Sequence, residues 1–236
     1  MLASYTASNV ERELRKHINV ERANHSPRFF KAGPGEYAEG DQFLGVPVPY
    51  QRAIAKRFSD LPLAELENLL HSPLHECRLT VLLIMVLRMK KLEEQEVIVE
   101  LYLDNLDYVN NWDLVDSSAP YILGKWLEKR DRKLLYTLAA SNHLWKQRVA
   151  MVTTLAWIRK GDMDDALKLS ETFLSHHHDL IHKATGWVLR ECWKQDPARV
   201  RSFLDTHVSV MPRTMLRYAI ELMDTPERKR YLAAPH

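Results

Sequence analysis

The stretch LHECRLTVLLIMVLRMK, residues 74–90, decides the fold class of this chain. Its apolar side chains recur at spacings of three and four residues, the period that places them on one face of an α-helix. They are Leu79, Leu82, Leu83, Val86 and Leu87. The most apolar segment, Leu79 to Leu87, is nine residues long, whereas a membrane span needs roughly 20 residues. We therefore expect a buried helix of a globular protein and no transmembrane segment.

Composition agrees with a helical globular protein. The chain has 236 residues, of which 46% are hydrophobic and 27% charged, a balance that is typical of a packed domain rather than of a disordered chain. Only 7 residues are Gly. Because hairpins and bulges of strand-rich folds need Gly, this scarcity argues against a sandwich or a barrel. No alternation typical of strands competes with the helical patterns, so we expect an all-α protein.

The helical pattern repeats along the chain as a shorter segment followed by a longer one. The expected pairs are Leu61–His71 with Leu74–Lys90, Glu93–Leu106 with Trp112–Lys129, Arg132–Ala140 with Leu144–Lys160, Asp164–Leu174 with Leu180–Lys194, and Pro197–His207 with Pro212–Met223. Second helices thus begin at intervals of about 32 to 38 residues, which is typical of an α-solenoid.

The N-terminal part is less regular. We expect a first helix over Ser8–Asn19, with Ser8 as its N-cap and Glu11 completing a capping box. Residues 27–49 hold four glycines and four prolines, which predicts a long loop, and the aromatic residues in it favour an ordered one. We expect a single domain over residues 1–236: these N-terminal elements, helix pairs over about 50–224, and a short C-terminal tail.

Charge is distributed unevenly although the formal net charge is only +2. Glu93 to Gly124 holds eight acidic residues and no Lys or Arg, whereas Lys125 to Lys160 holds nine basic residues and two acidic ones. This asymmetry suggests a basic stripe that binds a polyanion; the alternative is an ordinary solvated helix face. Basic residues also recur in the opening turns of the second helices, where we expect them to line one inner surface. They are Arg78, Arg148, Lys183 and Arg213.

One repeat departs from this rule. In the second pair the corresponding segment reads NNWDLVD, residues 110–116, and places Trp112 and Asp116 on one helix face at i, i+4. Asn111 is a candidate cap for this helix, and Asp113 is expected to interact with the helix dipole. Trp112 could equally be a core anchor and Asp116 a solvated carboxylate. A single unusual repeat in a uniform array is nevertheless where we look for chemistry.

Other candidate features are weaker. Gly186 lies inside a predicted helix beside Trp187, where it indicates a close approach, either of a ligand or of a neighbouring helix. The histidines at 176–178 and His182 lack Cys partners and a fixed face, which argues against a zinc site. Nucleotide-binding and serine-hydrolase motifs are absent from the sequence. Cys77 and Cys192 lie in apolar helical patterns, as reduced core thiols of a cytosolic protein would.

Four segments together resemble the AlkD family of DNA alkylation repair glycosylases, over about residues 8 to 224. They are FFKAGPGEYAEGDQFLGV (29–46), NNWDLVD (110–116), WKQRVAMV (145–152) and DLIHKATGWVLRE (179–191). The resemblance implies a right-handed α-solenoid of HEAT-like helix pairs that binds DNA on a concave basic face. It implies Asp116 as the catalytic carboxylate, Trp112 and Trp187 beside the sugar of the damaged nucleotide, Arg148 at the DNA backbone, and Tyr37 at the border of the site.

The resemblance also implies an activity. We expect a monofunctional glycosylase that removes N3- and N7-alkylated purines, such as 3-methyladenine and 7-methylguanine, from duplex DNA in base excision repair, without flipping the base. Lys183, Arg190, Arg159 and Lys160 are expected as further DNA contacts. We expect no metal, no cofactor, a cytoplasmic location and a monomer. The alternative is a non-catalytic HEAT-like scaffold that binds DNA or protein.

Overall fold

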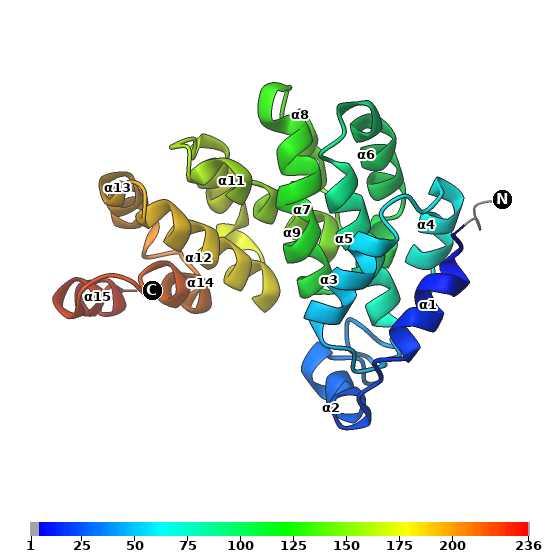
Figure 1. Cartoon of the computed structure of the whole chain (residues 1–236). Helices are drawn as coiled ribbons and strands as arrows, with labels where there is room; N and C mark the ends of the chain where they lie inside the picture. Colours follow the sequence, from blue (N-terminus) through cyan, green and yellow to red (C-terminus); the bar gives the residue numbers. More distant parts are fainter. Residues whose placement is uncertain (1–4, 236) are drawn as a thin grey trace. The chain divides into compact units, whose positions relative to one another are not determined.

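The structure of the chain, a computed structural model, describes residues 5–235. Every regular element among these residues is a helix (Figure 1), and their one β-type pairing is an isolated bridge between Gln42 and Leu74. The expected all-α helical-repeat fold is confirmed. None of the helices within this range is long and apolar enough to cross a membrane. The handedness and the concave face of the expected solenoid stay predictions.

Internal contacts group the chain into two compact units, Met1–Ser118 and Ala119–His236. The helices of the first unit are α1 (Ala7–Arg15), α2 (Val20–Phe30), α3 (Val48–Arg57), α4 (Leu63–Leu70), α5 (His75–Arg88) and α6 (Gln95–Asp104), followed by the start of α7 (Trp112–Trp126). The bounds of α4 to α7 agree with the expected pairs to within a few residues. The expectation of a single domain stays a prediction.

Helix α5 forms the centre of the first unit. It packs against α1, α3, α4 and α6, and Leu82, Ile84 and Met85 on it are fully buried. Its apolar residues are therefore not confined to the face that the sequence periodicity marks, because neighbouring helices surround it on several sides. The same central position buries the polar residues of its first turn, His75, Glu76 and Arg78.

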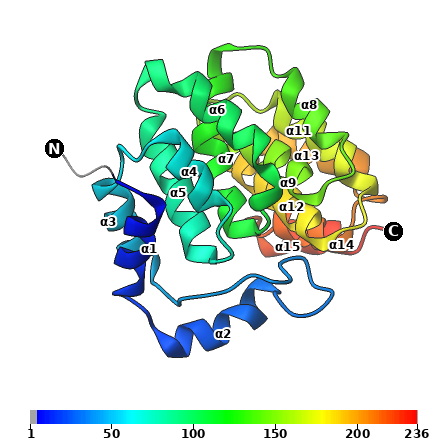
Figure 2. The same cartoon turned by 90° about the vertical axis from the view of Figure 1, so that its right-hand side faces the viewer.

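The N-terminal segment differs from the expectation of one helix over Ser8–Asn19 and a loop over 27–49. Helix α1 begins earlier, with Thr6 and Asn9 forming the capping box, and ends at Arg15. A separate helix, α2, follows Asn19, whose side chain accepts a hydrogen bond from the backbone N–H of Arg22. None of the residues of α2 is buried, so no apolar periodicity marked this helix in the sequence. Figure 2 shows α2 and the segment after it lying along one end of α1, α3 and α5.

The irregular segment therefore covers residues 31–47 and not 27–49. It begins where Lys31 ends α2 in a left-handed conformation, with φ of 59°. It ends where Pro47 precedes the first turn of α3. We call residues 31–47 the connecting segment below.

The second unit consists of further helix pairs. Its helices are the end of α7, α8 (Lys133–Ala139), α9 (Leu144–Thr153), α10 (Leu155–Ile158), α11 (Asp164–Thr172), α12 (Asp179–Trp193), α13 (Pro197–His207), α14 (Arg213–Ala219) and α15 (Thr225–Leu232). Helix α12 is the central one and packs against α9, α11, α13 and α14. The expected helix Leu144–Lys160 is divided at Thr154, whose hydroxyl donates to the carbonyl of Met151 at 2.7 Å.

The expected C-terminal tail is instead a helix, α15, held against α13. Asp224 caps it by accepting a hydrogen bond from the backbone N–H of Glu227. The carboxylate of Glu227 binds Arg201 at 2.7 Å, and the hydroxyl of Tyr231 donates to Asp205 at 2.9 Å. These contacts join α15 to α13 through polar groups, which an apolar periodicity cannot reveal.

Candidate functional site

Trp112 and Asp116 both lie on the first turns of α7, at i and i+4, and both side chains are half-buried. The start of the helix is fixed by Asn111, which is fully buried. Its side-chain oxygen accepts the backbone N–H of Trp112 at 2.9 Å, and its amide nitrogen donates to the carbonyl of Phe30 at 3.1 Å. Asn111 thus joins the start of α7 to the end of α2.

Aromatic rings from α2 pack on the Trp112 indole. The Phe30 ring is stacked on it, with centroids 5.9 Å apart, and the Phe29 ring meets it edge-on at 5.7 Å. Phe43 of the connecting segment is stacked on the Phe30 ring, with centroids 5.4 Å apart. Phe29 is 55% exposed although it is large and apolar. An indole with one supported side and an exposed phenyl ring beside it can stack on a planar or sugar surface.

The family resemblance implied Tyr37 as the aromatic residue at the border of the site. In the structure Tyr37 lies in the connecting segment and is half-buried. Phe29 and Phe30, at the end of α2, contact the Trp112 ring. Sequence reasoning noted these two phenylalanines only as signs of an ordered loop. The signal that could have found them is their place at the start of the first family-like segment, directly before Lys31.

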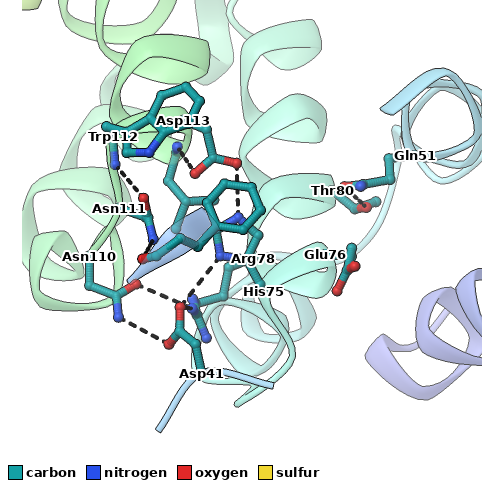
Figure 3. A network of polar contacts seen from close by, with 12 residues as sticks. Asp41, Gln51, His75, Glu76, Arg78, Thr80, Asn110, Asn111, Trp112 and Asp113 are labelled. Carbon is teal, nitrogen blue, oxygen red and sulfur yellow. Dashed lines mark hydrogen bonds and ion pairs between the residues drawn. The ribbon is translucent and has the colours of Figure 1, made fainter. Parts of the chain in front are cut away.

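A buried polar network lies beneath the aromatic rings (Figure 3). Nε2 of His75 is 2.8 Å from Oδ2 of Asp113, and Nδ1 of the same ring is 3.4 Å from Oδ2 of Asp41. Arg78 donates to Asp41 at 2.5 Å and to Asn110 at 3.2 Å. The amide of Asn110 in turn donates to Asp41 at 3.1 Å. The network therefore connects the connecting segment, the first turn of α5 and the start of α7.

The contacts within this network favour the charged forms of His75 and Asp41. Burial disfavours the charged form of His75, but the Asp113 carboxylate and a hydrogen bond to Asp41 outweigh it and raise the pKa of His75 to about 9. Burial likewise disfavours ionised Asp41, but the hydrogen bond with His75 and the charge of Arg78 leave the pKa of Asp41 below its usual value. At neutral pH the network thus contains two carboxylates, one guanidinium and one imidazolium.

The side-chain carboxylate of Glu76 anchors the connecting segment by binding backbone N–H groups of that segment. Its two carboxylate oxygens accept the N–H groups of Leu44, Gly45 and Val46 at 3.0, 2.7 and 3.3 Å. Gly45 has φ of 73°, and a Cβ there would lie 2.2 Å from the carbonyl oxygen of Asn19, so a side chain cannot be accommodated. These contacts are consistent with the expectation of an ordered segment.

An open pocket of about 470 Å³ lies along α2. Its lining combines an exposed aromatic ring with polar and charged groups, namely Glu21, Arg22, His25, Ser26, Phe29 and Phe30. Since Phe30 also supports Trp112, this pocket adjoins the aromatic cluster. No sequence pattern indicated it.

Three of the four basic residues in the opening turns of second helices do not line an open surface. Arg78 is 3% exposed and Arg148 is 5% exposed. Each donates to a backbone carbonyl at 2.7 Å: Arg78 to Ser72, Arg148 to Leu180, and the half-buried Arg213 to Leu232. The expectation that Arg148 faces solvent or DNA is corrected by this burial. These guanidinium groups join neighbouring elements because each can donate several hydrogen bonds at once.

The other residues proposed from the sequence lie within the second unit. Lys183 pairs with Asp179 on α12 at 2.7 Å, and Arg190 pairs with Glu221. Trp187 is half-buried on the same helix. Arg159 and Lys160 are exposed at the end of α10, with Lys160 paired to Glu128. Within this unit the structure brings Arg148 of α9 against the start of α12.

Gly186 marks a close contact with a neighbouring helix. A Cβ at this position would lie 2.5 Å from the carbonyl oxygen of Met215 and 2.5 Å from Cβ of Tyr218. Only a residue without a side chain allows α12 and α14 to approach this closely. Of the two alternatives that the sequence left open, the structure supports the neighbouring helix.

The histidine cluster makes protein contacts. Nε2 of His176 pairs with Gln147 at 2.9 Å, His182 pairs with the carbonyl of His176, and His178 caps α12. Across residues 5–235, no group of three or more His, Cys, Asp or Glu side chains is arranged to hold a metal ion. Cys77 and Cys192 are buried free thiols, and burial raises the pKa of each to about 12. Neither thiol is poised as a nucleophile.

Comparisons with known proteins identify a family and related structures. The family model described as DNA alkylation repair enzyme matches residues 10–223. A solved structure described as a predicted DNA alkylation repair enzyme from Enterococcus faecalis superposes with a TM-score of 0.69 at 21% identity, covering 89% of this chain and 98% of that one. At this identity the superposition shows a shared fold. No curated protein gives a significant match.

Proposed function

Because the chain belongs to the DNA alkylation repair enzyme family, which gives it a role in DNA repair, we propose that it is a DNA glycosylase. It hydrolyses the N-glycosidic bond of N3- and N7-alkylated purines, such as 3-methyladenine and 7-methylguanine, in duplex DNA. The observation that carries the proposal is the placement of Asp116 one turn after Trp112 on α7, both half-buried, with Trp112 supported by Phe30.

The chemistry of the proposed substrate suits so sparse a site. Alkylation at N3 or N7 gives the purine a positive charge, so the base leaves as a neutral molecule and no strong general acid is needed. The species that the enzyme must stabilise is the cationic sugar that develops as the glycosidic bond breaks, as in glycoside hydrolysis. A carboxylate next to that sugar stabilises the cation and orients the attacking water. In our proposal Asp116 has this role.

Aromatic rings contribute to the same stabilisation. The negative face of an indole attracts a nearby cation, with an energy that grows as water is excluded. We assign this role to Trp112 and, from the family resemblance, to Trp187. Phe29, exposed at the edge of the Trp112 indole, is an additional candidate for contact with the DNA.

DNA binding in this proposal depends on cations that remain accessible. Arg159, Lys160, Lys183 and Arg190 are the proposed phosphate contacts. Three of them form ion pairs within the protein, Lys160 with Glu128, Lys183 with Asp179 and Arg190 with Glu221. Such exposed pairs are weak, so a phosphate can replace the carboxylate partner. Arg148, being buried, contributes mainly by fixing the start of α12.

The test is direct. The purified protein is incubated with a duplex that contains one 7-methylguanine, and the released free base is measured by chromatography, with abasic sites measured by alkaline cleavage of the strand. We expect release of the free base without strand cleavage before the alkaline step. Duplex binding without any release of base, from this substrate or from a 3-methyladenine duplex, would instead establish a non-catalytic DNA-binding scaffold.

A further inference from the structure

His75 occupies an unusual position for a titratable residue. It is the first residue of α5, is 2% exposed, and has a carboxylate at each ring nitrogen, Asp113 on one side and Asp41 on the other. Its ring also packs against two phenyl rings, Phe30 at 4.5 Å and Phe43 at 5.2 Å between centroids. A protonated imidazole satisfies both carboxylates at once and is attracted by the aromatic faces.

Two short routes connect this imidazole to the Trp112 indole. The first runs through Asp113, the residue after Trp112, whose carboxylate binds His75 and also accepts the backbone N–H of Leu114 at 2.9 Å. The second runs through Phe30, which packs on the His75 ring and on the indole. Both the backbone turn that carries Trp112 and the ring that supports it therefore contact His75.

We propose that His75 is a positioning residue for Trp112: held between Asp41 and Asp113, its cationic ring fixes the first turn of α7 and the Phe30 ring, and so the orientation of the indole. The importance of that orientation for catalysis rests on the proposed function. The placement itself is a property of the protein without DNA, so it can be measured separately.

The charged groups that face His75 come from three elements. Asp41 approaches from the connecting segment, Asp113 from α7, and Arg78 from α5 itself. With His75 protonated these four groups sum to zero charge. Loss of the proton leaves a net negative charge in a buried site and leaves the carboxylate of Asp113 without a cation, which is unfavourable. The start of α7 should therefore loosen as His75 deprotonates, and the pKa of His75, about 9, sets where this occurs.

The first experiment follows the environment of the Trp112 indole by NMR and requires neither DNA nor enzymatic activity. The protein is labelled with 5-fluorotryptophan, the Trp112 signal is assigned by Trp112→Phe, and the ¹⁹F NMR spectrum is followed between about pH 7 and 10, the range in which this histidine is expected to titrate. We expect the Trp112 signal to shift with a midpoint near pH 9. In His75→Gln the signal should be displaced at neutral pH and should not titrate.

A matched control is available in the same unit. His71 also contacts a side-chain oxygen, that of Asn105 at 2.6 Å, and stacks on an aromatic ring, Tyr108 at 4.1 Å, but its oxygen partner belongs to an uncharged amide. His71→Gln should leave the Trp112 signal and its titration unchanged. A Trp112 signal that does not respond to pH across this range in the wild-type protein would refute the proposal, even if His75→Gln fails to fold.

The second experiment tests the consequence for catalysis. Under single-turnover conditions at neutral pH, His75→Gln should excise 7-methylguanine about 10- to 100-fold more slowly, since small displacements of catalytic groups have effects of this size. Its affinity for the duplex should change little. The double variant His75→Gln/Asp113→Asn should be no slower than His75→Gln, because both changes break one interaction.

The outcomes separate the two proposals. A titrating Trp112 signal with no base release by the wild-type protein would support the placement and contradict the proposed function. Excision by folded His75→Gln at the wild-type rate, or additive effects in the double variant, would overturn the positioning role while leaving the glycosylase proposal intact.

Discussion

Nε2 of His75, the first residue of α5, lies 2.8 Å from the carboxylate of Asp113, although the two residues are 38 positions apart and no local pattern in the sequence relates them. Asp113 was expected to act only on the dipole of α7, an effect of a few tenths to about 1 kcal/mol. Instead it belongs to a buried charge network, and both side chains are largely shielded, with 3% and 15% of their surfaces exposed.

The first prediction concerns this pair. Asp113→Asn removes the charge that most favours the imidazolium and should lower the free energy of unfolding by about 3 kcal/mol, the order found when one partner of a buried pair is removed. Asp104→Asn, which removes an exposed carboxylate at the end of α6, is the control and should change stability by less than about 0.5 kcal/mol. Urea unfolding at pH 7 measures both. A loss of only a few tenths for Asp113→Asn would mean that the helix dipole is its main partner after all.

The second prediction is the pH dependence of stability. The pKa of His75 is raised from 6.5 to about 9 in the folded state, so its contribution is complete below pH 6.5 and is lost as the pH rises through 9. The shift corresponds to at most about 3 kcal/mol. The pKa of Asp41 is lowered, so its contribution is present above its usual value of 3.8 and is lost as the pH falls below it. Urea unfolding across the pH range should show the free energy of unfolding falling at both acidic and alkaline pH. In His75→Gln the fall at alkaline pH should be smaller.

The third prediction concerns the proposed catalytic carboxylate. Asp116→Asn keeps the shape of the side chain but removes its charge, and should slow excision of 7-methylguanine about 10²-fold or somewhat less, the low end for lost electrostatic groups, since the leaving group is already cationic. Duplex affinity should hold or rise slightly, because a negative charge near phosphates is gone. Asp104→Asn again serves as the charge-matched control. The excision rate is measured under single-turnover conditions. An unchanged rate for Asp116→Asn would show that Asp116 is not the catalytic carboxylate.

The fourth prediction concerns DNA binding. Affinity for undamaged duplex should fall with salt, and Arg159→Ala should weaken binding and reduce the log–log salt slope by about 0.9, the value for one lost phosphate contact. Lys90, an exposed cation at the end of α5 outside the proposed contacts, is the control. Arg148→Ala, in contrast, should reduce thermal stability, because Arg148 is buried and bound to the carbonyl of Leu180. Fluorescence anisotropy and thermal unfolding separate these effects.

The fifth prediction concerns Gly186. Alanine is the better helix former by about 1 kcal/mol, yet Gly186→Ala should destabilise the protein by about 1–3 kcal/mol, as overpacking does, because the new Cβ meets backbone of α14. Gly161→Asn is the contrast: Gly161 has φ of 82° and nothing within 4 Å of the Cβ position, and Asn tolerates this conformation. Thermal unfolding should show a clearly smaller loss for Gly161→Asn.

The helix pairs could be predicted because their apolar residues follow the helical period. The expected Leu74–Lys90 is observed as His75–Arg88, and the expected Trp112–Lys129 as Trp112–Trp126. Helices α2 and α15 could not be predicted in the same way. The first buries none of its residues, and the second is held by Glu227, Asp205 and Tyr231 through polar contacts. Periodicity detects only helices that bury an apolar face.

The site shows the same limit. The i, i+4 relation of Trp112 and Asp116 follows from helix geometry and was readable in the sequence. The support of Trp112 by Phe30 and the pairing of His75 with Asp113 and Asp41 depend on contacts between distant segments, which local patterns do not encode. The basic residues were misleading for a related reason. A recurring Arg at helix starts marks a position, but only the fold decides whether its guanidinium faces solvent or a buried carbonyl, as in Arg148.

The anchoring of the connecting segment by Glu76 has an evolutionary consequence. The carboxylate holds backbone N–H groups, which every residue except proline possesses, so it imposes no side-chain identity on Leu44 or Val46 as hydrogen-bond donors. Gly45 is the exception, because its conformation and its contact with Asn19 admit no side chain. The attachment by Glu76 therefore leaves the residues between Lys31 and Gly40 open to changes of length and sequence, whereas Asp41 is held by its own contacts with Arg78 and Asn110. Such changes would alter the surface of the connecting segment without disturbing the helices that it packs on.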